Sequence, residues 1–382
     1  MIAILPLKWR MVVVMLLVHK VELRPSEKQE QQLLQWVGTT RHCYNSLLTN
    51  FSKEGVKFSK KTAREYLYNT LRVENGWYSD VSQAILQESI SDLENAYRRF
   101  FKRLGGYPKF KKRRGKNSFS LRQSKKFKVE GNNLYLEKFN KVRKAKPLKM
   151  REKLRFEGIP KQVTVSFQNG KWFASILVEG CDNYKGNFDQ HRSVGIDLGI
   201  KDLATLSDGT TFQKSNKLAL NLSKLVKLQR NLSKKKKGSN RYAKAKLSIS
   251  KLHFRVRKQR EALLHNVSHT ITSKYRVICL EDLSISSMTK GKNKKLNRMI
   301  LDVGMYELRR QLEYKSFLRG VDIRFVGRYY PSSKIHHECG FKNENLKLGQ
   351  SIWKCKGCGQ QVDRDLNASK NILTEGLRLV NK

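Results

Sequence analysis

Two short motifs near the C-terminus restrict this chain more than any other feature. His336 and Cys339 are separated by two residues and followed by glycine, and Cys355 and Cys358 repeat that spacing, again with glycine next. Fifteen residues lie between the two pairs, a distance typical of zinc ribbons. Three thiolates and one imidazole form a closed tetrahedral set, which indicates one structural zinc ion rather than a catalytic one. The adjacent His337 is the alternative ligand, although the spacing favours His336.

A second pattern consists of three carboxylates at the edges of apolar segments. Asp197 lies in an apolar run, Glu281 directly follows another, and Asp365 precedes the expected final helix. A carboxylate at a buried strand end costs free energy unless a cation compensates it. Acidic groups that converge from separate elements can hold two Mg²⁺ ions and promote phosphodiester hydrolysis. The residues alone leave open that each acid only caps a helix or pairs with one of the many Lys and Arg residues.

The charge balance points to a polyanionic partner. The chain carries 79 Lys and Arg residues against 32 Asp and Glu, a net charge of +47. Such a chain repels itself unless a negative partner is present, so nucleic acid is expected, and a membrane surface is the weaker alternative. The length of 382 residues, 39% of them hydrophobic, allows two or three domains with real cores.

Two further observations concern the compartment. The chain has six cysteines, three of which lie in the two motifs, so a disulfide framework is not expected and a reducing, cytoplasmic setting is favoured. No run of about 18 uncharged apolar residues occurs, so no membrane span is predicted.

The N-terminal half is predicted to hold a strand, a helical module and a small β barrel or sandwich. Apolar and polar residues alternate at 17–23, which is typical of a strand. Ser26 with Gln29 then forms the signature that starts a helix. Helical patterns continue to about Phe101, so residues 31–105 are interpreted as a mostly helical module. Further short strands are expected at 134–136, 163–167 and 172–178, with turns at 130–132 and 169–170.

The C-terminal half alternates strands with helices, which predicts an α/β domain with a mixed sheet. A buried strand at 194–200 is expected to pair with a hairpin partner, 203–212, that turns at Asp208 and Gly209. The helical pattern of 217–274 is broken at 234–240, so two basic helices should form a hairpin. The other expected elements are strands at 276–280 and 322–326 and helices at 301–318 and 367–380.

The segment 102–128 interleaves cations with aromatic residues. This composition suits phosphate contacts combined with stacking on bases or sugars. A charged run can equally be a solvated face, but the overall charge favours a nucleic-acid role. The candidate contacts are Tyr107, Lys109, Phe110, Lys111, Lys112, Arg113, Arg114, Lys116, Phe119 and Arg122.

Several motifs closely resemble the TnpB-type nucleases of insertion-sequence transposons, also known as OrfB transposases and related to type V CRISPR nucleases. In the C-terminal half they are VGIDLGIKDLATLSDG, VICLEDLS, RYYPSSK, the two Cys/His motifs and VDRDLNASKNIL. In the N-terminal half they are MLLVHKVELRP and GGYPKFKKRRGKNSFSLRQ. The likeness covers nearly the whole chain from Met15, so residues 1–14 are interpreted as a possible start extension. One departure is His336, where the family usually has cysteine.

The resemblance implies a fold and domain bounds. It implies a C-terminal α/β nuclease domain, RNase H-like and of the RuvC type, over 191–330 and 360–382, with an inserted zinc ribbon at 331–359. It further implies an N-terminal β-barrel wedge domain over 15–30 and 106–190, with an inserted helical recognition domain at 31–105.

The resemblance also implies a function, that of an RNA-guided DNA endonuclease of transposon origin. Asp197, Glu281 and Asp365 would bind two Mg²⁺ ions for DNA hydrolysis, and the Cys/His motifs would bind one Zn²⁺ ion. The partners would be a guide RNA from the transposon end and double-stranded DNA next to a short transposon-adjacent motif, with the guide supplying sequence recognition. The location would be the prokaryotic cytoplasm, at the nucleoid when the protein is on DNA.

Two other functions remain as alternatives. A non-cleaving RNA-guided DNA-binding regulator would share the fold, and loss of one catalytic carboxylate would be its signature, whereas all three are present. A strand-transferring transposase would use a Tyr nucleophile beside a paired-His motif, but the only adjacent histidines, His336 and His337, fall in the predicted ribbon.

Overall fold

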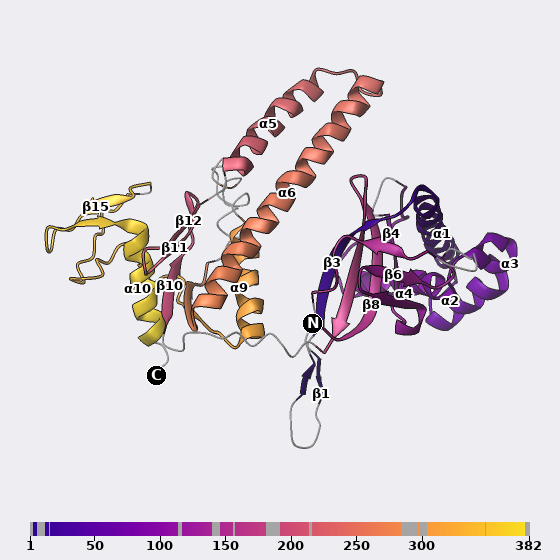
Figure 1. Ribbon diagram of the computed structural model, residues 1–382, viewed down its shortest axis with the longest axis horizontal. Coiled ribbons are helices and arrows are strands. Elements are labelled where there is room, and N and C mark those ends of the chain that lie inside the picture. Colours follow the sequence, from indigo (N-terminus) through magenta and orange to yellow (C-terminus); the bar gives the residue numbers. More distant parts are fainter. Residues whose placement is uncertain are drawn as a thin grey trace. The chain divides into compact units, whose positions relative to one another are not determined.

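The chain forms two compact units, Met1–Asn183 and Tyr184–Lys382 (Figure 1). The computed structural model describes residues 3–5, 12–14, 16–113, 117–139, 146–155, 157–180, 192–213, 216–283, 297, 304–347 and 349–378. Each unit has its own hydrophobic core. Two short strands, β1 (Ala3–Leu5) and β2 (Val12–Val14), pair antiparallel within the predicted start extension.

A barrel-like sheet of seven antiparallel strands forms the centre of the first unit, with the order β4-β8-β9-β3-β7-β6-β5. The β8–β9 hairpin turns at Asn169 and Gly170, both with positive φ, as a tight two-residue turn requires. The strands predicted at 17–23, 134–136, 163–167 and 172–178 are confirmed as β3 (Leu16–Arg24), β6 (Asn133–Leu136), β8 (Ile159–Gln168) and β9 (Lys171–Glu179). Three further strands were not predicted: β4 (Asn117–Leu121), β5 (Phe127–Glu130) and β7 (Leu148–Met150).

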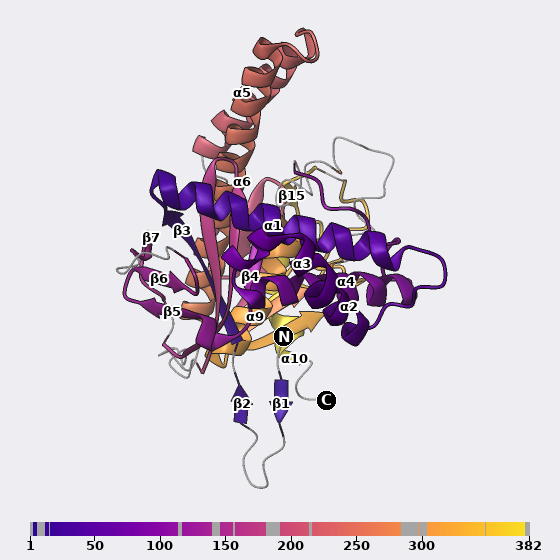
Figure 2. The same ribbon diagram turned by 90° about the vertical axis from the view of Figure 1, so that its right-hand side faces the viewer.

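Helix α1 (Glu27–Phe51) lies across this sheet (Figure 2). It begins with the predicted capping box, in which the Ser26 hydroxyl accepts the Gln29 N–H and the Gln29 side chain accepts the Ser26 N–H. Trp36 on α1 is fully buried and packs edge-on against Phe119, 5.5 Å away between ring centroids. The apolar face of α1 therefore closes the core of the sheet.

The other helices of the first unit pack on the C-terminal half of α1 around Leu47, Leu67, Tyr78 and Leu93. The helical pattern predicted up to about Phe101 is confirmed. The elements are α2 (Lys60–Tyr66), η1 (Leu67–Leu71), α3 (Arg72–Glu74), η2 (Gly76–Asp80) and α4 (Gln83–Phe101), with a short η3 (Ser124–Lys126) in the sheet region.

The second unit is built on a mixed five-stranded sheet, as predicted, with the order β12-β11-β10-β13-β14. Strands β10, β13 and β14 run parallel, whereas β11 and β12 are antiparallel to their neighbours. The strands are β10 (Ser193–Asp197), β11 (Asp202–Leu206), β12 (Thr211–Gln213), β13 (Val277–Glu281) and β14 (Asp322–Val326).

The predicted bounds of the first hairpin in this unit were wrong. The strand expected at 194–200 ends at Asp197, because the chain turns tightly at Gly199, where a Cβ atom would lie 2.7 Å from the Asp202 carbonyl oxygen. The segment expected as one partner strand is itself the β11–β12 hairpin, and Asp208 and Gly209 form its turn. The apolar run thus continues past the strand into the turn.

Four helices are described in the second unit: α5 (Asn216–Ser233), α6 (Asn240–Lys274), α9 (Met305–Arg319) and α10 (Arg364–Arg378). The C-terminal part of α6 and α9 cover one face of the sheet through Leu264, Ile271 and Leu308. The rest of α6 pairs with α5 around Leu225, Ile249 and Leu252 and extends away from the sheet, as the predicted hairpin (Figures 1 and 2). Residues 301–303 of the helix predicted at 301–318 lie outside the described residues.

Helix α10 contacts β10 and β13 at two glycines. A Cβ atom at Gly195 would lie 2.0 Å from the Ser369 carbonyl oxygen, and one at Gly376 would lie 2.4 Å from the Cys279 Sγ. Glycine is therefore required at both positions for α10 to pack this closely on the sheet. This packing fixes the helix against the strand that carries Asp197.

Between β14 and α10 the chain forms a small two-stranded element, β15 (Ile352–Lys354) and β16 (Gln361–Asp363), paired antiparallel. Trp353, Cys355 and Val362 form its core. In the described part of the chain, no helix is both long and apolar enough to cross a membrane.

Candidate functional site

The structure brings the ligand atoms of His336, Cys339, Cys355 and Cys358 within 4.8 Å of one another. The His336 Nδ1 lies 3.1 Å from the Cys339 Sγ and 3.4 Å from the Cys358 Sγ, and the Cys339 and Cys355 sulfur atoms are 3.5 Å apart. This donor set, three sulfurs and one imidazole nitrogen, fits a four-coordinate structural zinc ion. The arrangement could therefore hold a metal ion.

Two equivalent turns build this cluster. The Gly340 N–H donates to the His336 carbonyl at 2.9 Å, and the Gly359 N–H donates to the Cys355 carbonyl at 2.9 Å. Both glycines have positive φ, near 70–80°, which a glycine adopts without strain. The glycine after each motif therefore lets the chain fold back so that its two ligands meet.

His337, the alternative ligand, points to α10 instead. Its backbone N–H donates to the Asn367 Oδ1 at 2.8 Å, and its Nδ1 lies 3.2 Å from the Asn371 Oδ1. His337 therefore belongs to the contact between the ribbon and α10.

Asp197 and Glu281 end neighbouring parallel strands. Ile196 on β10 is paired with Leu280 on β13, so the next residue on each strand is a carboxylate at the same edge of the sheet.

The predicted position of the third acid was wrong in one respect. Helix α10 begins at Arg364, not Asn367, so Asp365 lies in its first turn rather than before it. The reason is Asp363, whose Oδ1 accepts the N–H groups of Asp365 and Leu366 at 3.0 and 2.9 Å and so caps the helix.

The negative charges of Glu281 and Asp365 act on Asp197. The pKa of Asp197 is raised to about 8, first by burial and then by the negative charges of Glu281 and Asp365, while Arg364 opposes the shift. Burial also raises the pKa values of Glu281 and Asp365. A bound cation would stabilise the ionised form of carboxylates whose pKa values are raised in this way. Oxygen ligands are those that Mg²⁺ prefers.

Ser332 is a site residue that the sequence analysis missed. It lies in the RYYPSSK motif, is buried, and its hydroxyl donates to the Glu281 Oε1. This bond lowers the pKa of Glu281 against the larger effect of burial. No spacing rule connects positions 281 and 332, so only the motif itself could have indicated the residue.

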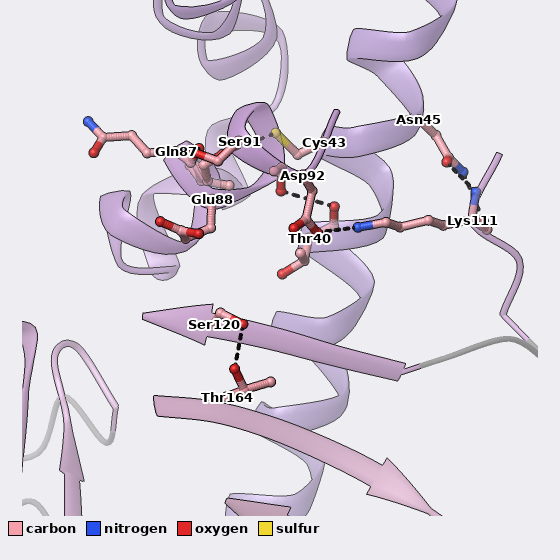
Figure 3. A network of polar contacts seen from close by, with 12 residues as sticks. Thr40, Cys43, Asn45, Gln87, Glu88, Ser91, Asp92, Lys111, Ser120 and Thr164 are labelled. Atoms are coloured by element: carbon pink, nitrogen blue, oxygen red, sulfur yellow. Dashed lines mark hydrogen bonds and ion pairs between the residues drawn. The ribbon is translucent and has the colours of Figure 1, made fainter. Parts of the chain in front are cut away.

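Part of the basic segment 102–128 makes contacts within the first unit, and Figure 3 shows those of Lys111. Lys111 is used within the unit: Asn45 bonds its backbone N–H and carbonyl at 2.8 and 3.0 Å, and its Nζ pairs with Asp92 at 2.7 Å. Arg122 pairs with Glu88 at 2.8 Å. The Tyr107 hydroxyl lies 3.3 Å from the Ser52 Oγ, with much of its ring exposed. These contacts attach the segment to α1 and α4.

The prediction of Phe119 as a nucleic-acid contact was wrong. This residue is 2% exposed and packs against Trp36 inside the core of the sheet, so no base can stack on it. Of the other described candidates, those with exposed side chains are Tyr107, Lys109, Phe110, Lys112, Arg113 and Arg122. Arg114 and Lys116 lie outside the described residues.

Comparison with known proteins identifies the family. A family model described as "Probable transposase" (OrfB_IS605) matches residues 176–292, and a "Cas12f1-like, TNB domain" model matches 306–372. The chain is 35% identical over 378 residues to a protein of Escherichia coli K12 named as a proposed RNA-guided DNA endonuclease, InsQ, covering 94% of this chain and 91% of that protein. The chain belongs to the OrfB (TnpB) family.

A second OrfB relative gives the same result. A protein of Streptomyces pristinaespiralis, also named as a proposed RNA-guided DNA endonuclease, is 31% identical over 368 residues, which cover 94% of this chain and 89% of that protein. A "Helix-turn-helix domain" model of the same family matches residues 11–54, although in this OrfB protein Glu27–Phe51 of that range form the single long helix α1.

A solved structure supports the fold of this OrfB protein. The Cas12f1 chain in a cryo-EM structure of the Cas12f1–sgRNA–target DNA complex aligns with a TM-score of 0.55 at 14% identity, over 94% of this chain and 98% of that chain. The family resemblance inferred from the motifs is thus confirmed by the relatives, and the overall fold is shared with the Cas12f1 structure.

Proposed function

We propose that this protein is an RNA-guided DNA endonuclease of transposon origin, which hydrolyses DNA with Mg²⁺ next to a short transposon-adjacent motif. The observation that carries the proposal is the position of Asp197 and Glu281 at the ends of neighbouring parallel strands, with Asp365 in the first turn of α10 and its charge acting on Asp197. The relatives named as RNA-guided DNA endonucleases support DNA as the substrate and RNA as the guide. A non-cleaving regulator would not need this costly arrangement of half-buried acids.

The domain assignment is part of the proposal. The mixed sheet with α10 packed against it supports an RNase H-like, RuvC-type nuclease domain over 191–330 and 360–382, with the ribbon at 331–359. The barrel-like sheet supports a wedge domain over 15–30 and 106–190. The helices around α4 support a recognition domain at 31–105.

The residues have distinct tasks in this mechanism. Asp197 and Glu281 lie on adjacent strands and would hold divalent ions together with Asp365 from α10. Two Mg²⁺ ions, when bound, would activate water and stabilise the leaving oxygen. The Ser332 hydroxyl donates to the Glu281 carboxylate, and Asp363 caps the first turn of α10, which contains Asp365.

Two experiments on the purified protein test this function. Sequencing of the RNA that co-purifies with it should identify a transcript of the transposon end. The protein–RNA complex should then cut matching double-stranded DNA only when Mg²⁺ is added. A complex that binds matching DNA in Mg²⁺ and leaves both strands intact would instead indicate the regulator.

The α5–α6 hairpin supports nucleic-acid binding by its charge. Residues 209–260 contain 17 Lys and Arg and no Asp or Glu. Lys244, Lys251 and Arg255 are exposed on α6, and their spacings of seven and four residues place them on one side of the helix. This side can contact successive phosphates of the guide RNA or of its duplex with DNA.

Removing these charges should weaken RNA binding in a salt-dependent manner. For the triple variant Lys244→Ala, Lys251→Ala and Arg255→Ala, we expect the slope of log affinity against log salt to fall by about 2–3, since each phosphate contact contributes about 0.7–0.9. The control is the triple variant of Arg310, Lys342 and Arg378 to Ala, cations that pair with acids of the chain. Equal slopes for the two variants would contradict the role of the hairpin.

Zinc binding gives a further prediction. Metal analysis of the purified protein should find about one zinc ion per chain, and Cys355→Ser should lose it because a structural site needs all of its ligands. Cys43→Ser is the control, since Cys43 is buried in the helical core of the first unit. A wild-type protein without zinc would show that the cluster is not a metal site.

A further inference from the structure

The segment 332–337, which leads into the ribbon, is held to α10 by two buried asparagines. The Asn371 Nδ2 donates to the carbonyls of Ser332 and Ile335 at 2.7 and 2.6 Å. The Asn367 Nδ2 donates to the Ile335 carbonyl at 2.7 Å. Asn367 and Asn371 are four residues apart, so both side chains lie on the same side of α10.

These bonds decide where the Ser332 side chain lies. Asn367, Asn371 and Ser332 are each only 4% exposed, and a buried amide that loses its partners is costly, so the segment has little freedom to shift. At the start of this segment, the Ser332 hydroxyl donates to the Glu281 carboxylate. Near its end, His336 is a member of the Cys/His cluster, and the His336 backbone N–H donates to the Phe341 carbonyl at 2.8 Å.

A continuous set of contacts therefore joins the two clusters. It runs from the Cys/His cluster through residues 335–337 to Asn367 and Asn371, and from Ser332 to Glu281. Asp365 lies two residues before Asn367 on the same helix. The helix that holds the ribbon thus also carries one of the carboxylates.

We propose that Ser332 is a positioning residue for the metal-binding carboxylate Glu281, and that Asn371 sets the position of Ser332 from α10. This inference rests on the proposed function of the carboxylate cluster. Ser332 acts through Glu281: its hydroxyl occupies one lone pair of the carboxylate and orients the other oxygen toward the shared site. Partners that orient metal ligands in this way typically affect metal affinity by about 10–100-fold.

The test is titration of Mg²⁺ into the full-length, RNA-free protein, followed by calorimetry, with zinc content measured on the same samples. We expect Ser332→Ala to weaken Mg²⁺ binding by about 10–100-fold and to keep its zinc, and Ser332→Thr to restore most of the affinity because it retains the hydroxyl. Ser369→Ala is the matched control, since it removes a buried hydroxyl that bonds the Leu366 carbonyl of the same helix.

A double variant tests the route through Asn371. Asn371→Ala should weaken Mg²⁺ binding in the same direction as Ser332→Ala, and the double variant should lose much less than the two single effects combined, because both act on Glu281. If wild type binds Mg²⁺ and Ser332→Ala binds it equally well, the inference is wrong while the proposed function stands. If wild type binds no Mg²⁺ at the carboxylates, both are wrong.

Discussion

Asp197→Ala is expected to reduce DNA cleavage by more than about a hundredfold, since even residues that only orient a metal ligand affect activity by about 10–100-fold. The negative charges of both Glu281 and Asp365 raise the pKa of Asp197. Asp197 is therefore the central acid of the proposed metal site, and its removal takes away that ligand. The substitution also removes a carboxyl group whose ionised form is disfavoured by its surroundings, so the fold should not be destabilised.

Binding provides the control for this prediction. RNA and DNA affinity should change less than about twofold, because phosphate contacts from Lys and Arg supply most of that free energy. Cleavage is measured in single-turnover reactions with RNA-saturated protein, and DNA binding by gel shift in the same buffer. A variant that cuts as fast as wild type would exclude Asp197 from the reaction.

Gly195→Ala is expected to have the second large effect, on stability. Its Cβ atom would lie 2.0 Å from the Ser369 carbonyl oxygen and 2.6 Å from the Leu373 nitrogen. Both are backbone atoms of α10, so the helix must move away from β10. We expect the free energy of unfolding to fall by about 3 kcal/mol, at the upper end of overpacking effects, and cleavage to fall with it because Asp365 moves with the helix.

Gly209→Ala is the matched control for this substitution. Gly209 has a φ of +85°, but a Cβ atom there would meet no other atom within 4 Å. The cost should therefore be only the strain of a left-handed backbone, about 1 kcal/mol. Urea unfolding followed by circular dichroism measures both variants. Equal unfolding free energies for the two would refute the close packing of α10 on β10.

Local chemistry explains why much of the fold could be predicted from the sequence. The capping box at Ser26 and Gln29, the Asn169–Gly170 turn and the strand at 322–326 all depend on residues next to one another, and all are confirmed. The Cys/His motifs also depend on neighbouring residues, because the glycine that follows each pair forms the turn that brings its two ligands together.

The parts that could not be predicted depend on distant contacts. Phe119 alternates with polar residues in a basic segment, and only the contact with Trp36 shows that its side faces the core. Lys111 lies in a charged run, and only its contacts with Asp92 and Asn45 show that it pairs with residues of its own unit. Asp363 could have been found as a helix cap, since an Asp directly before a helical pattern is a known start signal.

For the carboxylates, the sequence predicted one part of the site and not the other. The apolar runs indicated that Asp197 and Glu281 lie at strand edges, but not that their strands are neighbours. That fact depends on the parallel pairing of β10 with β13 across the long α5–α6 insertion. The motif resemblance supplied what the residue pattern could not, the choice of these three acids.

Titration of Mg²⁺ into the full-length, RNA-free protein tests the central claim most directly. The comparison is between wild type and the single variants Asp197→Asn, Glu281→Gln and Asp365→Asn, which keep the size of each side chain and remove its charge. We predict that wild type binds Mg²⁺ and that each of the three variants binds it at least about tenfold more weakly. Wild-type affinity in any one of them, or no binding by wild type, would contradict a metal site shared by the three carboxylates.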